Sequence, residues 1–260
     1  MGGREHLTSG TLMVGTKKSL GQHWLKNREV LDEIASLAGS GTVCVEIGPG
    51  LGFLTSSLLR RFDKVIAVEY DDRLAENLPK SFPGKNLEVV HGDFLEYDFK
   101  GVESPFMIAG NIPYYITSPI IEKVLKLPVL PERVVLLIHK EEAERILSDK
   151  ETVLSLFVKN HAMVSAGPVV RAELFTPPPK VDSEVIVMEP FKDGPKVPEE
   201  VFELIRRGFS SPRKKLMHNL GGLKSKEELF KNFKELDISV DVRPGDLKLE
   251  DWSNLYGKLC

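Results

Sequence analysis

Five short apolar runs, each rich in β-branched residues, constrain the fold of this 260-residue chain more than any other feature. They are separated by segments with helical spacing, which is the pattern of a parallel sheet whose strands are joined by right-handed crossovers. The sequence therefore predicts an α/β fold with a doubly wound, Rossmann-like sheet. The runs are residues 43–47, 64–69, 87–91, 105–110 and 133–138, and the helical segments between them include 51–62, 71–80 and 117–126.

Further segments extend this pattern on both sides. Asn27 opens an amphipathic helix before the first strand, and Gly39 ends it. After the fifth run, residues 139–148 have helical spacing. Three later apolar segments are of the kind that closes such a sheet with antiparallel strands at its edge. They are residues 152–158, 162–175 and 183–189.

A proline-rich stretch divides the chain into two parts. Residues 190–198 contain three prolines and one glycine, which makes this stretch a linker. We expect a Rossmann-like domain over residues 1–190, beginning with a basic arm at 1–28, and a small helical domain over 198–260. The second domain is predicted from four segments with helical spacing, at 199–209, 212–221, 225–236 and 246–257.

Composition excludes several classes of protein. Hydrophobic residues make up 42% of the chain and charged residues 28%, which is typical of a globular protein with a sizeable core. The apolar runs are far shorter than a membrane span, and we expect a soluble, cytoplasmic protein with no membrane partner. The two cysteines, Cys44 and Cys260, offer neither a disulfide framework nor the spacing of a metal site, so we expect no metal.

The charged residues are unevenly distributed. The net charge is −3, yet residues 17–28 hold four Lys or Arg and no acid, and residues 206–215 hold five and no acid. Clusters of this kind suit contact with nucleic-acid phosphates, while two solvated surfaces are the alternative explanation. Nothing in the sequence demands an oligomer, so we expect a monomer.

A glycine-rich turn follows the first strand and opens a helix. Residues 46–52, "EIGPGLG", place backbone N–H groups and closely approaching glycines beneath a bound ligand. The spacing differs from G-x-G-x-x-G, and Glu46 would repel a pyrophosphate. An acid beside Gly48 and Gly50 suits a cofactor with an amino-acid ammonium group, which favours S-adenosylmethionine over NAD.

Two more acids stand where the next strands end. Glu69 ends the second strand, where a carboxylate can accept hydrogen bonds from both ribose hydroxyls. Asp93 follows the third strand and can accept from the exocyclic amine of adenine. Each acid alone could be a helix N-cap or a surface acid, but together with Glu46 they line the carboxyl edge where open α/β sheets bind ligands.

The stretch "AGNIPYYI" follows the fourth strand on the same edge. Asn111 presents an amide oxygen, Pro113 fixes the turn so that the Ile112 carbonyl points inward, and Tyr114 offers a flat ring. Two such acceptors would draw an adenine N6 amine toward tetrahedral geometry and aim its lone pair at a methyl group. No strong base is needed. A simple turn capped by asparagine is the alternative, and Tyr115 is expected to be a packing residue.

Six motifs in order resemble the ribosomal RNA adenine N6-dimethyltransferase family, the dimethyladenosine transferases. They are "GQHWL", "EIGPGLG", "VEYD", "GDFL", "NIPYYI" and "FTPPPKVDS". The resemblance runs from about Lys17 to the C-terminal helices. It implies a Rossmann-like S-adenosylmethionine-dependent methyltransferase sheet with a helical C-terminal domain. The implied activity is dimethylation of two adjacent adenosines in a hairpin near the 3′ end of small-subunit rRNA, in an immature ribosomal subunit.

The resemblance also implies roles for single residues. Gln22, His23 and Leu25 would lie at the methionine end of the cofactor with Gly48, and Asn111 would lie near the transferred methyl group. Phe175 and Tyr114 would stack on both faces of a flipped adenine, although Phe175 taken alone reads as a core residue. Phosphate contacts would come from Lys17, Lys18, Arg206, Arg207, Arg213, Lys214 and Lys215.

Three features depart from the family pattern. Trp24 stands where a smaller apolar residue is common, Glu184 stands where a small residue is usual, and the loop near 149–152 is short.

Two other functions stay open at this point. One is methylation of an adenine in large-subunit rRNA, of the macrolide-resistance type, which the "PPPKVDS" loop and the long C-terminal part disfavour. The other is a non-catalytic ribosome-assembly or transcription factor on the same fold, which the intact acids and Asn111 disfavour.

Overall fold

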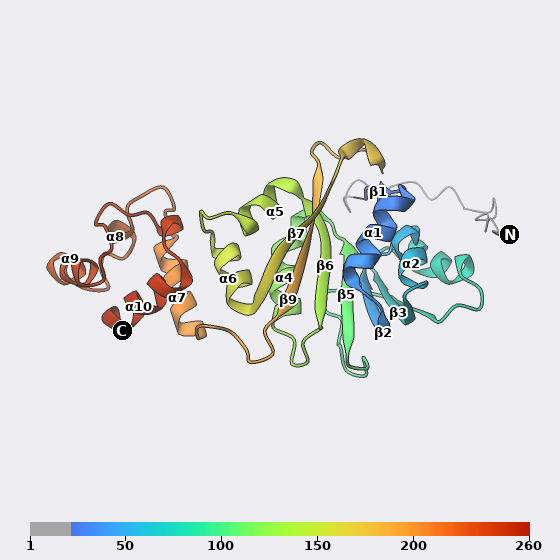
Figure 1. The fold of residues 1–260 in the computed structure, drawn as a ribbon, viewed down its shortest axis with the longest axis horizontal. Coiled ribbons are helices and arrows are strands. Elements are labelled where there is room, and N and C mark those ends of the chain that lie inside the picture. The colour runs from blue at the N-terminus through green and yellow to red at the C-terminus, as the bar shows by residue number, and fades with distance from the viewer. Residues whose placement is uncertain (1–21) are drawn as a thin grey trace.

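A seven-stranded sheet forms the centre of the computed structural model, which describes residues 22–260 (Figure 1). Within those residues the strand order is β4-β3-β2-β5-β6-β9-β7. The five predicted parallel strands are confirmed, and they pair in parallel from β4 through β6. Their bounds are β2 Gly41–Ile47, β3 Phe62–Glu69, β4 Leu87–His91, β5 Phe106–Asn111 and β6 Arg133–His139.

Two late strands close the sheet with an antiparallel edge, as the sequence predicts. β9 (Ser183–Pro190) runs antiparallel to β6, and β7 (Ala162–Val170) runs antiparallel to β9. The prediction of a strand at 152–158 is wrong, because this segment lies in helix α6 (Val153–His161). The Thr152 and Ser155 side chains cap the first turn of α6 reciprocally, which starts a helix where the apolar run alone gives no clear period.

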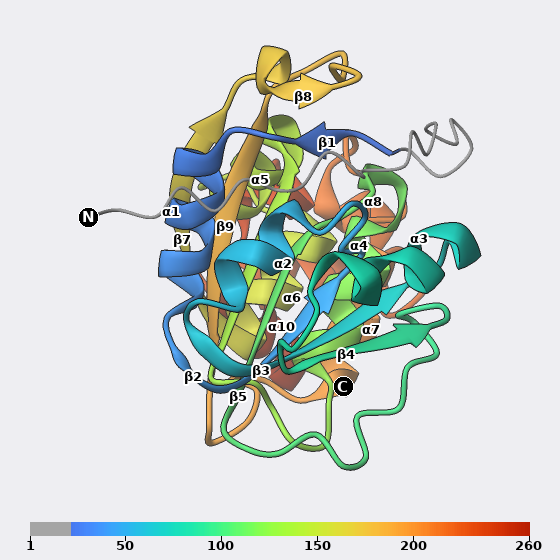
Figure 2. The ribbon, with the colours of Figure 1, turned by 90° about the vertical axis from the view of Figure 1, so that its right-hand side faces the viewer.

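Helices cover both faces of the sheet (Figure 2). α1 (Arg28–Ala38) and α2 (Phe53–Leu58) pack on one face, and α4 (Thr117–Leu125), α5 (Lys140–Leu147) and α6 pack on the other. Asn27 caps α1 by accepting from the Val30 amide, and Gly39 ends the helix, so both predicted helix signals are confirmed. α3 (Asp72–Asn77) and a 3-10 turn (Leu78–Ser81) follow β3, and a second such turn (Tyr114–Ile116) precedes α4.

The C-terminal part is helical, and it lies at the left end of the molecule in Figure 1. Its elements are α7 Glu199–Gly208, α8 Leu216–Asn219, α9 Lys226–Glu235, a 3-10 turn at Pro244–Asp246 and α10 Leu249–Leu259. The helix expected over 212–221 is reduced to the single turn of α8. Trp252 is fully buried, and it belongs to the same hydrophobic core as the strand residues of the sheet. The two predicted domains therefore share a continuous core, while the boundaries of 1–190 and 198–260 stay a prediction.

Among residues 22–260, no helix is long and apolar enough to cross a membrane.

A paired glycine experiment tests the packing of the turn after β2. Gly52 and Gly84 both have left-handed φ angles, of 82° and 72°. A Cβ atom on Gly52 would come within 2.7 Å of Leu78 and Phe82, whereas one on Gly84 would meet nothing within 4 Å. We expect Gly84→Ala to lower the free energy of unfolding by about 1–2 kcal/mol. Gly52→Ala should lower it by a further ~1–3 kcal/mol through overpacking. Equal losses in urea titration would contradict this account of the turn.

Candidate active site

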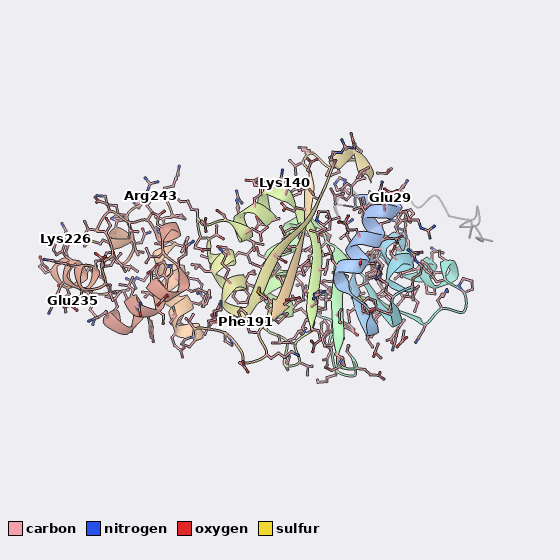
Figure 3. All side chains as sticks on the ribbon, in the orientation of Figure 1. Glu29, Lys140, Phe191, Lys226, Glu235 and Arg243 are labelled. Atoms are coloured by element: carbon pink, nitrogen blue, oxygen red, sulfur yellow. The ribbon has the colours of Figure 1, made fainter. Side chains whose placement is uncertain are left out.

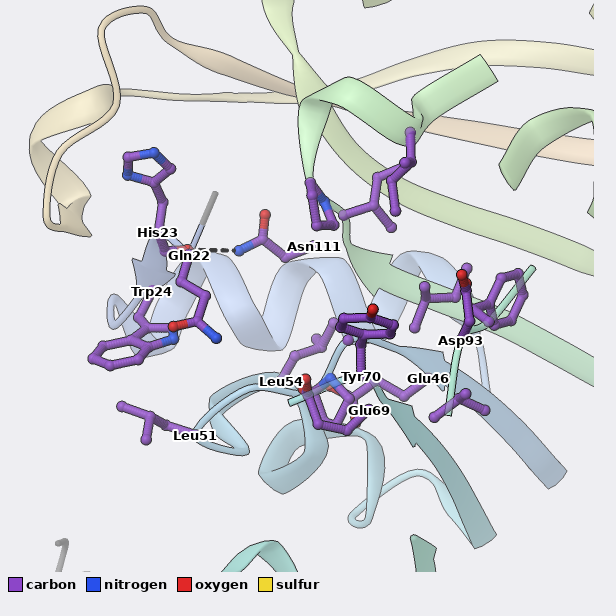
Figure 4. Close-up of a pocket in the computed structure, with 18 of the residues that line it drawn as sticks. Gln22, His23, Trp24, Glu46, Leu51, Leu54, Glu69, Tyr70, Asp93 and Asn111 are labelled. Atoms are coloured by element: carbon purple, nitrogen blue, oxygen red, sulfur yellow. Dashed lines mark hydrogen bonds between the residues drawn. The ribbon is translucent and has the colours of Figure 1, made fainter. Parts of the chain in front are cut away.

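The acids predicted at the strand ends meet around one cavity of about 360 Å³ (Figure 4). β4, β3, β2 and β5 are consecutive neighbours in the sheet, so their carboxyl ends bring Asp93, Glu69, Glu46 and Asn111 together. Of the predicted site residues, the cavity is lined by Gln22, His23, Leu25, Glu46, Gly48, Glu69, Asp93, Asn111, Ile112 and Pro113.

Glu69 organises the turns on either side of it. Its Oε2 accepts from the Gly50 amide at 3.0 Å, and its Oε1 accepts from the Asp71 amide at 2.8 Å. Burial raises the pKa of Glu69, and these backbone hydrogen bonds oppose the rise by favouring the charged form. Gly50 thus reaches the site through Glu69, since it does not line the cavity itself.

Glu46 is the most deeply buried of the acids, with 1% of its surface exposed. Burial raises its pKa to about 8, against the hydrogen bond that Thr55 Oγ1 donates to Glu46 Oε2 at 2.6 Å. The nearby Glu69 charge raises it further. At neutral pH the Glu46 carboxyl group is therefore mainly protonated in the ligand-free protein.

Residues 22–25 form a cover over one side of the cavity, which we call the lid. β1 (Trp24–Leu25) pairs with β8 (Phe175–Thr176) in a two-stranded antiparallel sheet. The Trp24 indole lies over the glycine-rich turn, where a Cβ on Gly50 would be 3.4 Å from Trp24 Nε1. The large ring of Trp24 therefore packs close to this turn.

Side-chain hydrogen bonds tie the lid to two other loops. The Gln22 amide donates to Asp71 Oδ2 at 3.2 Å, beside the turn that holds Glu69. His23 Nδ1 lies 2.8 Å from the carbonyl oxygen of Pro177, and since a carbonyl can only accept, Nδ1 carries the proton in this contact. The lid is thus joined both to the acid edge and to the "FTPPPKVDS" loop.

Asn111 is held by the lid as well. Its Nδ2 donates to the His23 carbonyl at 3.1 Å, drawn as the dashed line in Figure 4. Because the amide nitrogen is used in this way, Oδ1 is the atom that Asn111 presents as an acceptor. The next residues keep the turn close to the sheet: the Ile112 amide donates to Leu137 O at 3.3 Å, and Pro113 has a φ of −61°.

Two tyrosines at the cavity were not assigned to it from the sequence. Tyr70 and Tyr115 both line the cavity and are 62% and 64% exposed. The prediction that Tyr115 packs inside the protein is wrong, because the short turn after Pro113 leaves its ring in solvent. The position of Tyr70 directly after Glu69 at a strand end could have identified it, whereas nothing in the sequence separates Tyr115 from a core tyrosine.

Phe175 and Tyr114 are the two rings that the sequence predicts to stack on the target base. Phe175 is only 3% exposed, packs in the core with Leu25 and does not line the cavity. Its role against a base stays a prediction. The side chain of Tyr114 lies outside the described residues.

The basic residues predicted to contact RNA in the second domain lie on α7 and in the loop between α7 and α8. Arg206 pairs with Glu199 at 2.7 Å, Lys215 pairs with Asp241 at 2.5 Å, and Arg207 donates to the Gly221 carbonyl. Arg213 and Lys214 are exposed. Lys17 and Lys18 lie outside the described residues, and the role of all these residues in RNA contact stays a prediction.

The composition of the cavity fits S-adenosylmethionine. Glu69 and Asp93 offer acceptors for ribose hydroxyls and an adenine amine, and Glu46 lies beneath the glycine-rich turn as a partner for an ammonium group. Apolar walls suit the adenine ring and the methionine chain, and they come from Leu51, Phe53, Leu54, Val68, Phe94 and Leu95. The carboxylates of Glu69 and Asp93 at this cavity would repel a pyrophosphate.

Comparisons with known proteins agree on one family. A family model described as "Ribosomal RNA adenine dimethylase" matches residues 13–259. The chain is 36% identical to Ribosomal RNA small subunit methyltransferase A of Nostoc sp., covering 95% of this chain and 99% of that protein. It is 38% identical to the protein of the same name from Gloeobacter violaceus, covering 94% of each.

Solved structures are similar as well. A dimethyladenosine transferase from Plasmodium falciparum has a TM-score of 0.78 at 29% identity and covers 90% of this chain and 96% of that one. The 23S rRNA methyltransferase ErmE has a TM-score of 0.73 at 25% identity, covering 91% and 99%.

Glu46 should make stability depend on pH. Its folded-state pKa of about 8 lies above the ordinary value of 4.5, so below pH 4.5 the group is protonated in both states. As pH rises from 4.5 to 8, the unfolded chain loses this proton while the folded protein keeps it, and stability falls. The full loss is on the order of 3–5 kcal/mol.

Glu46→Gln removes the titrating group, so its unfolding free energy should fall less than that of wild type over this range. Urea titrations at pH 5, 6, 7 and 8 measure the difference, and parallel pH profiles would show that Glu46 is ionised in the folded protein.

Proposed function

The chain belongs to the ribosomal RNA adenine dimethylase family, and we propose that it dimethylates N6 of two adjacent adenosines near the 3′ end of small-subunit rRNA. It is an S-adenosylmethionine-dependent rRNA adenine dimethyltransferase. The orientation of the Asn111 side chain is the main observation that supports the proposed site. Its amide nitrogen donates to the His23 carbonyl, so its amide oxygen remains as an acceptor at a cavity lined with acidic side chains.

The cofactor supplies a methyl group on a positively charged sulfur. We assign its adenosine part to Glu69 and Asp93, and its methionine part to the lid residues Gln22, His23 and Leu25. The glycine-rich turn with Glu46, Gly48 and Gly50 lies beneath it.

Asn111 and the Ile112 carbonyl hold the target amine. In the first transfer each accepts one N6–H group, which fixes the amine and weakens the delocalisation of its lone pair into the ring. The monomethylated amine of the second transfer has one N–H group, which one of the two acceptors takes. Pro113 holds the turn that aims the carbonyl. After transfer the nitrogen is positively charged and loses its proton readily, so no strong base is required. Tyr114 and Phe175 are the rings we assign to the two faces of the flipped base, and Phe175 would have to become more exposed to take this part.

The choice of RNA rests on the relatives. The proteins at 36% and 38% identity are named small-subunit methyltransferases, whereas the 23S rRNA methyltransferase ErmE is 25% identical. Both chemistries need the same amine site, so the cavity alone does not choose between them. We propose that the substrate is a hairpin in an immature small subunit, met by a monomer in the cytoplasm.

Mass spectrometry of rRNA tests this function directly. Small-subunit particles that lack the modification are incubated with the protein and S-adenosylmethionine, and large-subunit rRNA is treated in parallel. We expect two dimethylated adenosines in the small-subunit RNA. Product on the large subunit alone would favour the macrolide-resistance type, and the absence of cofactor binding in calorimetry would favour a non-catalytic factor.

Asn111→Ala tests the amine site. The variant loses one positioned acceptor, so kcat should fall by about tenfold to a thousandfold while the affinity for RNA stays nearly intact. Asn86→Ala is the control, because Asn86 lies on the surface, and its amide donates to the Asp63 carbonyl, away from the cavity. Turnover of the Asn111 variant at the wild-type rate would refute the role.

A triple variant tests the basic surface of the second domain. Replacing Arg213, Lys214 and Lys215 by Ala should weaken RNA binding and reduce the slope of log K against log salt by about 2–3. Replacing Lys226, Lys231 and Lys234 by Ala changes the charge equally on α9, at the far end of the second domain (Figure 3). If both triple variants change the slope equally, the RNA does not prefer the 213–215 surface.

A further inference from the structure

The short loop at 148–152 is fastened to the second domain. The Glu151 amide donates to the Gly245 carbonyl at 2.7 Å, and Lys248 Nζ donates to the Asp149 carbonyl at 2.5 Å. An exposed pair, Lys150 with Asp246, adds a contact at 3.3 Å. The two segments approach so closely that a Cβ on Gly245 would lie 2.8 Å from the Glu151 carbonyl oxygen.

A buried carboxylate stands at the centre of this junction. The Glu151 side chain is only 2% exposed and is compensated by two lysines, one from each side of the junction. Lys159 of α6 lies 2.9 Å from Oε2, and Lys248 lies 3.1 Å from Oε1. Ser155 Oγ donates to Oε2 at 2.7 Å, so the carboxylate has three donors. We call the contacts of Glu151 with Gly245 and Lys248 the latch.

The other end of α6 holds the linker. The Asn160 side chain bonds both backbone groups of Val197. Its Nδ2 donates to the Val197 carbonyl at 3.1 Å, and its Oδ1 accepts from the Val197 backbone amide at 2.8 Å. Between these two ends, Phe157 of α6 packs edge-on against Phe202 of α7 with ring centroids 5.9 Å apart. α6 is thus bonded to the linker near its end, packs against α7 through Phe157, and follows the loop that contacts the second domain.

The latched segment adjoins the basic surface of the second domain, which consists of Arg213, Lys214 and Lys215. The exposed Arg243 directly precedes Pro244 and Gly245. Val242, the residue before Arg243, is bonded to the residue that follows the 213–215 loop, because the Leu216 amide donates to the Val242 carbonyl at 2.8 Å. Figure 3 shows Arg243 on the same side of the molecule as Lys140, the first residue after β6 at the carboxyl edge of the sheet. The latch therefore joins the segment next to Arg243 to the loop that precedes α6, in the domain that contains the cavity.

We propose that Lys248 is a positioning residue for the rRNA substrate: through the latch it fixes the basic surface of the second domain at the distance from the cavity that the RNA spans. This inference rests on the proposed function. An RNA that contacts both domains can place its target base in the cavity only if the orientation of the two domains relative to each other is fixed. Loosening the latch should therefore weaken productive RNA binding without changing the chemistry of a base that has entered the cavity.

The test uses a double variant, Gly245→Ala with Lys248→Met. Lys248→Met removes the cross-junction cation but leaves Glu151 paired with Lys159 and Ser155, so no buried charge is orphaned. Gly245 has no left-handed φ, so alanine causes no backbone strain there. Its effect is the steric clash of its Cβ with the Glu151 carbonyl oxygen. The matched control is Gly257→Ala with Lys258→Met on α10, the helix that follows Lys248. A Cβ on Gly257 meets nothing within 4 Å, and Lys258 pairs with Glu235 inside the second domain.

Three quantities are measured on the full chain: the affinity for S-adenosylmethionine, KM and kcat for small-subunit particles, and a distance between the domains. For the distance, one label is placed on the exposed Cys260 and another on α4 after the substitution Glu122→Cys, while the fully buried Cys44 is shielded from labelling. We expect the latch variant to broaden the distance distribution and to raise KM about 5- to 30-fold, with cofactor affinity and kcat within about twofold of wild type. The control variant should match wild type in all three.

An unchanged distance distribution would show that the latch does not fix the domains, and a broadened distribution with an unchanged KM would show that their orientation does not matter for the RNA. Either result overturns the proposal. Failure of the proposed function is separate, because in that case the wild-type protein itself would not methylate the particles.

Discussion

The hydrogen bond from the Asn111 amide to the His23 carbonyl is the contact on which the account of the site depends. It leaves the asparagine oxygen as the acceptor, and it does so only while the lid lies in place. The lid is held in turn by its pairing with β8, by the contact of His23 with Pro177 and by the contact of Gln22 with Asp71. The lid, Asn111 and the "FTPPPKVDS" loop are therefore one connected unit, although they come from distant parts of the sequence.

The acids on the same edge differ in their surroundings. Glu69 receives two backbone hydrogen bonds that favour its charge, whereas Glu46 receives one hydroxyl in a buried place where burial dominates. A carboxylate with two backbone donors is fixed in direction, which suits recognition of a ribose. A protonated buried acid instead responds to a cation brought near it. Two similar side chains on neighbouring strands thus have distinct properties because of their neighbours.

Periodicity and motif order predicted the parallel strands and the acid edge, because each depends on local sequence. The strand expected at 152–158 failed, since a seven-residue apolar run fits a buried helix equally well and the reciprocal cap of Thr152 and Ser155 decides. Tyr115 failed because exposure depends on how the following turn leaves the sheet. Glu184, unexplained from the sequence, is buried on β9, and burial and Glu144 raise its pKa while Lys140 opposes them. The latch joins Glu151 and Lys248, which are almost a hundred positions apart, and no local sequence pattern predicts such a pair.

The central claim is that the Asn111 amide oxygen, oriented by the lid, accepts the hydrogen bond of the target amine. A structure of the protein with S-adenosylhomocysteine and an RNA hairpin carrying the target adenosine measures this contact directly. The account predicts Asn111 Oδ1 at about 2.7–3.2 Å from the adenine N6, with Nδ2 still bonded to the His23 carbonyl. An adenine N6 beyond about 3.5 Å from Oδ1, or an amide turned so that its nitrogen faces the base, would contradict it.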